Sequence, residues 1–281
     1  MINVIGLGNA GCNIADLLSE YPQYKIYKID TNLAKGKGCF SLPTCTNPED
    51  YESKLPTKVI NALKKIEGKV VLIVGGGGKI SSGALRILEC TQSNPIEVIY
   101  IKPDESAAAA PALMRDKISF NVLQQYARSG VFERVYIVSN SEIERAVGNI
   151  PLSHYYTKIN SIISSTFHML NVYKNTSASF SRFSDPDGIS RISTFGMGTM
   201  EKVVDQMFYG LDHINEREYY FAINEKQLDE DPQLLTTINR RIKQNDVTIK
   251  AGFGVYSTPY EQNYIYVIAN TKIIQGVNYD E

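Results

Sequence analysis

The sequence of 281 residues is poor in the side chains that bind transition metals, with four cysteines and three histidines. Cys39 and Cys45 are the one close cysteine pair, no CxxC spacing occurs, and no histidine lies near them to complete a zinc site. The histidines, His154, His168 and His213, are scattered along the chain. We therefore predict no metal site built from these side chains, and free thiols in a reducing compartment.

Long apolar runs and a large net charge are also absent. No stretch approaches the ~20 consecutive apolar residues of a membrane span, and the short apolar stretch at residues 2–7 leads into a glycine turn rather than a signal-peptide cleavage site. The formal net charge of −1 gives no strong signal for nucleic acid or an anionic membrane. With 43% hydrophobic and 21% charged residues, the composition is that of an ordinary globular chain. We predict a globular cytoplasmic protein.

The first half of the sequence alternates apolar strands with helical stretches, which predicts a parallel sheet covered by helices. These apolar strands are each followed by a polar or glycine-rich loop, and ligands of such sheets bind at the carboxyl ends of the strands. The predicted strands are 2–6, 24–30, 69–74, 97–101 and 134–138, and the predicted helices are 11–20, 57–66, 84–90 and 118–130.

The second half changes pattern after a long helix predicted over residues 152–172. A loop rich in serine, asparagine and aspartate follows at 175–188, and then come helices at 200–211 and 232–244 with strands at 218–223, 247–255 and 263–269. The last two strands would form a C-terminal hairpin. The predicted fold class is therefore α/β: a Rossmann-like parallel sheet domain over 1–151, a central helix over 152–174, and a smaller α+β domain over 175–281.

The first glycine motif is GLGNAG, from Gly6 to Gly11, placed between a strand and a helix. Glycines let the backbone approach a phosphate, and a helix N-terminus supplies free N–H groups and a favourable dipole. Asp30 ends the next strand, where a dinucleotide-binding fold holds a ribose. Taken alone, this motif predicts an NAD-dependent oxidoreductase, although no convincing catalytic base accompanies it. The structural alternative is a tight turn without a ligand.

A second glycine-rich run, GGGGKISSG from Gly75 to Gly83, again follows a buried strand and precedes a helix. Lys79, Ser81 and Ser82 could donate to phosphate oxygens. The run is not a P-loop, because the first glycine of that motif would fall on Ile73, within the strand. A dinucleotide fold does not require a second phosphate loop at this place. A site that wraps a triphosphate from both sides does.

Taken in order, these motifs resemble the tubulin/FtsZ superfamily of GTP-binding, filament-forming proteins. GLGNAGCN resembles the first phosphate loop of the family, and Gly75–Gly83 falls where its signature G-G-G-T-G-[ST]-G lies. Further matches are Asn47-Pro48-Glu49, Lys102-Pro103, Ser139-Asn140 and the closing strand pair VTIKAGFGVY…NYIYVIANT. The resemblance covers nearly the whole chain and is to a compact, diverged member of the family, of the kind common in phages and plasmids.

The resemblance implies a GTP/GDP site, with Mg²⁺ as an accompanying ion, and assigns residues to it. Tyr156 would stack near the guanine and Asn160 would read it. The remaining nucleotide-binding positions are Gly6, Gly8, Asn9, Ala10, Gly11, Asn13, Asp30, Gly76, Gly77, Gly78, Lys79, Ser81, Ser82, Gly83 and Glu105. It also implies a head-to-tail homopolymer, in which Asp187, with Asp185 beside it, enters the site of the next subunit, and an adaptor or cargo of unidentified nature.

Two departures from the family pattern affect the chemistry. Lys79 and Ile80 occupy a glycine and a threonine position of the signature, and Ser190 stands where a second acid is expected. A lone carboxylate gives weaker help to an attacking water than two do. The alternatives are therefore a non-hydrolysing structural or interaction member of the same superfamily and, further off, the NAD-dependent oxidoreductase. Asp185 and Asp187 could also belong to a solvated turn.

Overall fold

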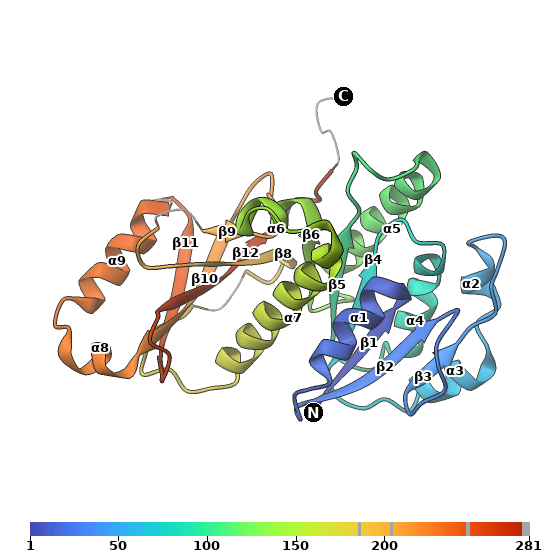
Figure 1. Cartoon of the computed structure of the whole chain (residues 1–281), viewed down its shortest axis with the longest axis horizontal. Coiled ribbons are helices and arrows are strands. Elements are labelled where there is room, and N and C mark those ends of the chain that lie inside the picture. Colours follow the sequence, from blue (N-terminus) through green and yellow to red (C-terminus); the bar gives the residue numbers. More distant parts are fainter. Residues whose placement is uncertain (185–186, 203–204, 246–247, 277–281) are drawn as a thin grey trace.

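One sheet runs through the whole molecule in the computed structural model, which describes residues 1–184, 187–202, 205–245 and 248–276 (Figure 1). Within these ranges twelve strands pair in the order β3-β2-β1-β4-β5-β6-β8-β12-β10-β11-β7, and β9 lies beside β8. The parallel part comprises β1 (Ile2–Leu7), β2 (Tyr24–Asp30), β3 (Cys39–Ser41), β4 (Val70–Gly75), β5 (Ile96–Lys102), β6 (Arg134–Ser139) and β8 (Ile192–Gly198).

The remaining strands form the second part of the sheet. They are β7 (Phe180–Arg182), β9 (Gln206–Met207), β10 (Glu216–Asn224), β11 (Lys250–Thr258) and β12 (Tyr264–Thr271). β12 runs antiparallel to both β8 and β10, whereas β11 runs parallel to β10 and antiparallel to β7. The predicted C-terminal hairpin is therefore wrong, because β10 lies between β11 and β12. As a buried strand, β10 satisfies its backbone groups by pairing along both of its edges.

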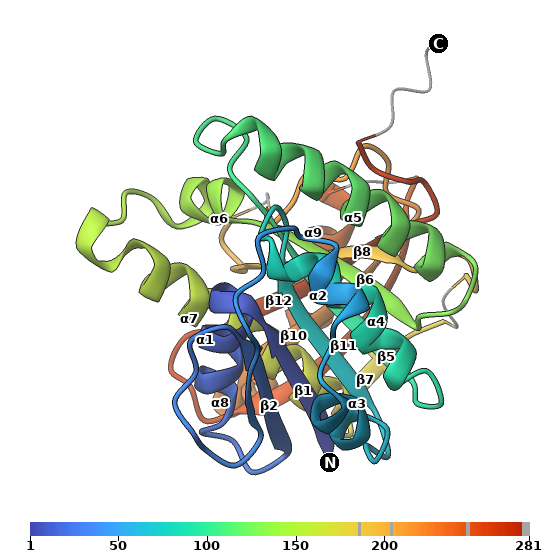
Figure 2. The same ribbon diagram turned by 90° about the vertical axis from the view of Figure 1, so that its right-hand side faces the viewer.

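Helices cover both faces of the parallel sheet (Figure 2). One layer holds α2 (Asp50–Ser53), α3 (Thr57–Leu63), α4 (Ala84–Cys90), α5 (Ala110–Arg128) and the 3-10 turn η1 (Ile80–Gly83). The other holds α1 (Gly8–Leu18), α6 (Asn140–Val147) and α7 (Tyr155–Lys174), which follows a short 3-10 turn, η2 (Leu152–His154). Helices α8 (Glu225–Glu230) and α9 (Leu234–Asn245) pack on the second part of the sheet.

The apolar pattern of the sequence explains these layers. Along β4, Leu72 and Val74 pack into one core and Val71 and Ile73 into the other, and all four are fully buried. A strand buried on both faces has no polar alternation, as the sequence of this segment indicated. The predicted α/β class with a parallel N-terminal sheet and a long central helix is confirmed.

The predicted helix at 200–211 is wrong over its described residues, where the chain forms β9 and an irregular return. Phe208 explains the difference: it is fully buried and packs edge-on against Phe195 of β8. Backbone pairing of Gly196 with Met207 holds this segment against the sheet. The apolar residues of this segment therefore pack along the edge of β8. A helical spacing of apolar residues does not by itself require a helix.

A charged cluster crosses the seam where β6 meets β8 over only two residue pairs. Arg134 of β6 bonds Glu218 of β10 at 3.0 Å, and Lys174 at the end of α7 donates to the Tyr136 hydroxyl at 2.9 Å. Burial by itself would raise the pKa of Glu218, but Arg134 and Lys174 outweigh burial and lower it to about 2. The cluster thus links strands of both parts of the sheet.

Replacing Glu218 by glutamine is expected to lower the free energy of unfolding by about 3 kcal/mol at pH 7. Because the folded-state pKa lies below the ordinary value of 4.5, the carboxylate stabilises the fold fully above pH 4.5, and this contribution disappears as the pH falls toward 2. Urea unfolding at pH 7 and pH 3 measures the change, with Glu225→Gln on the exposed start of α8 as control. A difference between Glu218→Gln and wild type that stays constant with pH would contradict this account.

Candidate functional site

The two glycine-rich loops lie side by side at the carboxyl edge of the parallel sheet. Strands β1 and β4 are paired along their length, with Leu7 opposite Val74, so the loops that follow them leave the sheet together. The ends of β5 and β6 lie farther along the same edge, with Lys102 opposite Ser139. This edge is where parallel α/β sheets bind their ligands.

The first loop is a direct passage from strand to helix, since α1 begins at Gly8 immediately after β1. Gly8 has a φ of +72°, which favours glycine. Gly6 and Gly11 lie back to back: a Cβ on Gly6 would overlap the Gly11 backbone, and one on Gly11 would overlap the Ile73 carbonyl of β4. No side chain caps α1, so the N–H groups of its first turn remain available to an anion.

The second loop is braced from behind by its own backbone groups. The N–H of Gly76 donates to the Ile101 carbonyl at 2.8 Å, and the Ser81 hydroxyl donates to the Gly75 carbonyl at 2.5 Å. Gly77 turns the chain with a φ of +80°. Ser81 is buried and its hydroxyl hydrogen is committed to the loop, whereas Ser82 is half-buried in the 3-10 turn that precedes α4.

The two unusual residues of this loop point in different directions. Lys79 has an ordinary helical conformation, φ −58° and ψ −45°, so the loop accepts a lysine there without backbone strain. Its exposed side chain reaches the loop after β3, where Nζ donates to the Thr46 carbonyl at 3.4 Å. Ile80 turns inward, packs into the core and lies beside Gly8 of the first loop.

Behind the second loop lies a polar cluster that sequence reasoning missed. Asp116 of α5 accepts from the Tyr100 hydroxyl at 2.7 Å and from Lys102 at 2.6 Å. Its neighbour Arg115 donates from Nε to the Gly77 carbonyl at 2.9 Å. Both α5 residues precede the predicted start of that helix at 118, so the sequence pattern did not mark them. The predicted ribose contact Glu105 is exposed, and its Oε1 lies 3.7 Å from Nζ of Lys102.

Other predicted nucleotide contacts lie on α1 and α7, which pack against each other, and at the end of β2. Asn13 is exposed and bonds Asn9 at 3.3 Å, while Asn160 of α7 is almost fully buried. The side chain of Tyr156, at the start of α7, is 68% exposed. Asp30, at the end of β2, accepts the Thr31 N–H at 2.7 Å. Asn13 and Asp30 thus lie beside the first glycine loop, on the helix that it begins and at the end of the neighbouring strand.

Asp187 lies at the opposite edge of the sheet. The loop that contains it runs into β8, where Ile192 pairs with Val135 at the amino end of β6. Arg191 fixes this loop against the segment before β6, because its guanidinium donates to the carbonyls of Gly188 at 2.8 Å and Phe132 at 2.9 Å. Asp187 is exposed, whereas its companion in the prediction, Asp185, lies outside the described residues.

Ser190, at the expected position of a second acid, is turned away from solvent. It is only 1% exposed, and its hydroxyl has no hydrogen-bond partner in the described part of the chain. Its N–H donates to the Asp187 carbonyl at 2.9 Å, which closes the loop into a tight turn. The surface of this turn therefore presents one carboxylate, that of Asp187.

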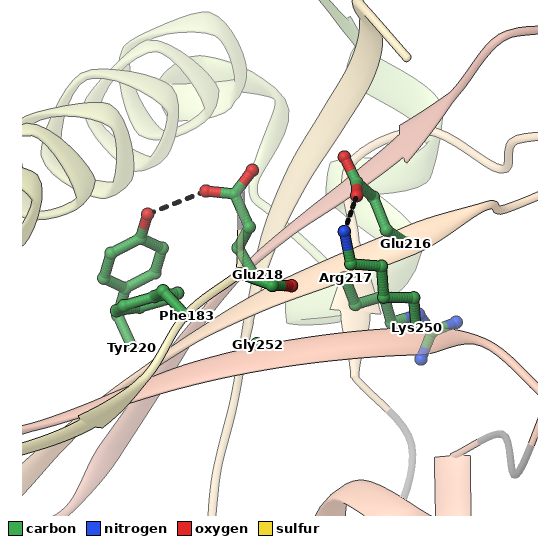
Figure 3. A pocket seen from close by; sticks show the side chains of 8 residues that line it. Phe183, Glu216, Arg217, Glu218, Tyr220, Lys250 and Gly252 are labelled. Carbon is green, nitrogen blue, oxygen red and sulfur yellow. Dashed lines mark hydrogen bonds and ion pairs between the residues drawn. The ribbon is translucent and has the colours of Figure 1, made fainter. Parts of the chain in front are cut away.

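A pocket of about 230 Å³ adjoins the Asp187 turn (Figure 3). Glu216 and Glu218 point into it from β10, with Lys250 3.7 Å from Glu216 and the Tyr220 hydroxyl 2.9 Å from Glu218. The Asp187 N–H donates to Glu216 at 3.4 Å. The carboxylates that face this pocket are thus paired within the protein.

Among the residues that the structure describes, no helix is long and apolar enough to cross a membrane. The same residues contain no group of three or more His, Cys, Asp or Glu side chains placed to hold a metal ion. Burial raises the pKa of the Cys12 thiol, which lies under the first glycine loop, to about 12, so this thiol is unreactive.

Comparison with known proteins gives its result at the level of the fold. No protein-family model matches the chain, and no curated protein sequence does. Among solved structures, CetZ from Methanosaeta thermophila is similar with a TM-score of 0.74 and 12% identity, covering 98% of this chain and 87% of that one. FtsZ of M. jannaschii, solved as an empty dimer, has a TM-score of 0.70 at 14% identity, covering 96% and 88%. TubZ of Bacillus thuringiensis, in a GTPγS-form protofilament, has a TM-score of 0.69 at 14% sequence identity. The match covers 96% of this chain and 86% of the TubZ chain.

Proposed function

We propose that this chain, which has the tubulin/FtsZ-like fold, binds guanine nucleotide at its glycine-rich edge and assembles head to tail. One observation carries the proposal: the two glycine loops and the Asp187 turn lie at opposite edges of one parallel sheet. A contact between these two unlike surfaces repeats from subunit to subunit without closing, and therefore builds an open filament.

In this proposal the nucleotide phosphates lie between the two glycine loops. The first turn of α1 offers N–H groups and the positive end of the helix dipole. Asn13 of α1 and Asn160 of α7 are the polar side chains that could read a guanine edge, and Tyr156, one turn before Asn160, supplies an exposed ring. Asp30 and Glu105 remain the predicted ribose contacts.

Asp187 is the predicted catalytic acid of the neighbouring subunit's site. As an exposed carboxylate at the tail edge, it can accept a hydrogen bond from a water that attacks the terminal phosphate. Ser190 is buried and supplies no second acidic group. Hydrolysis at such an interface would therefore rest on one carboxylate.

The similar solved structures support self-assembly, since those of TubZ and of CetZ2 from Haloferax volcanii are described as protofilaments. A filament that assembles with GTP and disassembles after hydrolysis would act in the cytoplasm. An adaptor or cargo could attach to the sides of such a filament. An accompanying Mg²⁺ would find an exposed carboxylate at Glu49 in the loop after β3, whereas two other carboxylates near the glycine loops are already bonded. Asp116 is committed to Tyr100 and Lys102, and Asp30 to the Thr31 N–H.

The test is the identity of the nucleotide in the purified protein. We expect chromatography of the acid-released base to show guanine, and sedimentation to show that GTP moves the protein into the pellet. Adenine, nicotinamide or no base, together with no GTP-dependent pelleting, would overturn the proposal. NAD(H) in place of guanine would instead support the oxidoreductase alternative.

A second candidate is a nucleotide-binding filament protein that does not hydrolyse GTP. The buried hydroxyl of Ser190 and the altered second loop at Lys79 and Ile80 favour it. Calorimetry and a phosphate-release assay on the same sample separate the two candidates. Tight GTP binding without phosphate release identifies the non-hydrolysing protein, and release coupled to assembly identifies the GTPase.

A further inference from the structure

The Asp187 turn is held from both sides by residues that belong to different parts of the sheet. After the turn, Arg191 donates to the Phe132 carbonyl at 2.9 Å, which attaches the turn to the segment before β6. Before the turn, Phe183 lies over the second part of the sheet, and the centroid of its ring is 5.4 Å from that of Tyr220 in β10. The position of Asp187 therefore depends on contacts with both parts.

Glu216, the first residue of β10, contacts the turn itself. Its Oε2 accepts the N–H of Asp187 at 3.4 Å, and its Oε1 accepts the side-chain amide of Asn270 at 3.3 Å. Nζ of Lys250 lies 3.7 Å from the same Oε2. Asn270 of β12 is fully buried, so Glu216 is itself fixed by the interior of the sheet. One carboxylate thus connects the Asp187 turn to three neighbouring strands, β10, β11 and β12.

Burial decides what Glu216 can do. Its side chain belongs to a residue that is 5% exposed, whereas Asp187 is exposed at the tail edge. A carboxylate enclosed in this way does not reach a nucleotide held by another subunit, so Glu216 does not act on the attacking water. The N–H that it accepts belongs to Asp187, and the contact fixes the backbone from which the exposed carboxylate extends. Such support matters because a displacement of about 1 Å can cost about 100-fold in rate.

The other contacts of the turn shape it without attaching it to the protein. The Ser190 N–H closes the turn on the Asp187 carbonyl at 2.9 Å, and the Asp187 carboxylate accepts the Ile189 N–H at 3.4 Å. The Ser190 hydroxyl has no partner in the described part of the chain. Within that part, the side-chain hydrogen bonds that attach the turn to the rest of the protein are those of Arg191 and Glu216.

We infer that Glu216 is a positioning residue for hydrolysis, which fixes the Asp187 turn on β10 so that the Asp187 carboxylate meets the nucleotide of the neighbouring subunit. The inference rests on the proposed function and adds to it a residue from the second part of the sheet. It requires that Glu216 affects the rate of phosphate release, kcat, and not the affinity for GTP.

The experiment measures GTP affinity and phosphate release per assembled subunit for variants of the full chain. Glu216→Leu, which has no acceptor, should lower kcat about 10- to 100-fold and leave the GTP dissociation constant within about twofold of wild type. Glu216→Gln has the same shape and keeps one acceptor oxygen for two donors, so kcat should fall about 3- to 10-fold.

A double variant tests whether Glu216 acts through Asp187. Adding Glu216→Leu to Asp187→Asn should slow phosphate release by no more than about twofold, because the carboxylate that Glu216 positions is already gone. A residue that only stabilises the fold would lower the rate by the same factor in both backgrounds. A double variant about tenfold slower than Asp187→Asn would therefore show that the inference is wrong.

Glu218→Gln is the matched control, since Glu218 lies on the same strand and faces the same pocket, and its described contacts are with residues outside the turn. It should lose stability and keep the wild-type kcat per assembled subunit. Wild-type kcat in Glu216→Leu, or in Glu216→Gln if the leucine variant does not fold, would overturn the inference while the proposed function stands. If wild type binds guanine nucleotide and releases no phosphate, the inference is wrong and nucleotide binding stands. If it binds none, both are wrong.

Discussion

Replacing Asp187 by asparagine is expected to lower GTP turnover about 100-fold while leaving nucleotide binding unchanged. The turn that holds Asp187 lies at the sheet edge remote from the glycine loops, so its carboxylate cannot act on the nucleotide of its own subunit. Asparagine keeps an oxygen that can accept the Ile189 N–H, a contact of 3.4 Å in the turn. The variant therefore removes the charge and spares the loop. Phosphate release per assembled subunit measures the effect.

Mixing variants tests whether the site is completed in trans. A Gly11→Ala subunit, whose nucleotide edge is disrupted, still carries Asp187, and an Asp187→Asn subunit still binds GTP. We expect the mixture to release phosphate much faster than either variant alone. Asp229→Asn, which removes an acid of α8, is the control. Turnover of Asp187→Asn at the wild-type rate would exclude this carboxylate from the reaction.

The second large effect is expected from Gly11→Ala at the start of α1. A Cβ at this position would overlap the backbone carbonyl of Ile73, and neither strand nor helix can move alone, because Gly6 is packed against the Gly11 backbone. The substitution should lower the free energy of unfolding by about 1–3 kcal/mol. It should also shift the N–H groups of the first turn out of place, so that guanine-nucleotide affinity falls by about 100-fold or more, equivalent to losing two charge-assisted hydrogen bonds.

Gly210→Ala is the matched control, since a Cβ there meets no atom within 4 Å. Thermal unfolding and nucleotide titration of the two variants give the comparison. The prediction fails if Gly11→Ala binds guanine nucleotide as wild type does. A loss of stability without loss of affinity would show that the close packing of α1 on β4 serves the fold and not the ligand.

Several strands could be predicted because they are buried on both faces, and a short continuous apolar run between turn residues is typical of such strands. The segment from Val70 to Val74 is the clearest case. The strand at Tyr24–Asp30 is only partly buried, but it also has its predicted ends. The prediction failed where pairing partners are not neighbours in sequence. Nothing local in β11 and β12 indicates that β10 inserts between them, because strand order is decided by contacts made across the whole chain.

By itself, the sequence determined that two glycine-rich loops each follow a buried strand and precede a helix, because only glycine permits their backbone conformations and close packing. The tertiary structure decided what the other loop residues can do. It committed the Ser81 hydroxyl to Gly75, buried Ser190, turned Ile80 into the core and placed Arg115 behind Gly77. Such outcomes depend on which distant segments pack together, and a local pattern of residue types does not contain that information.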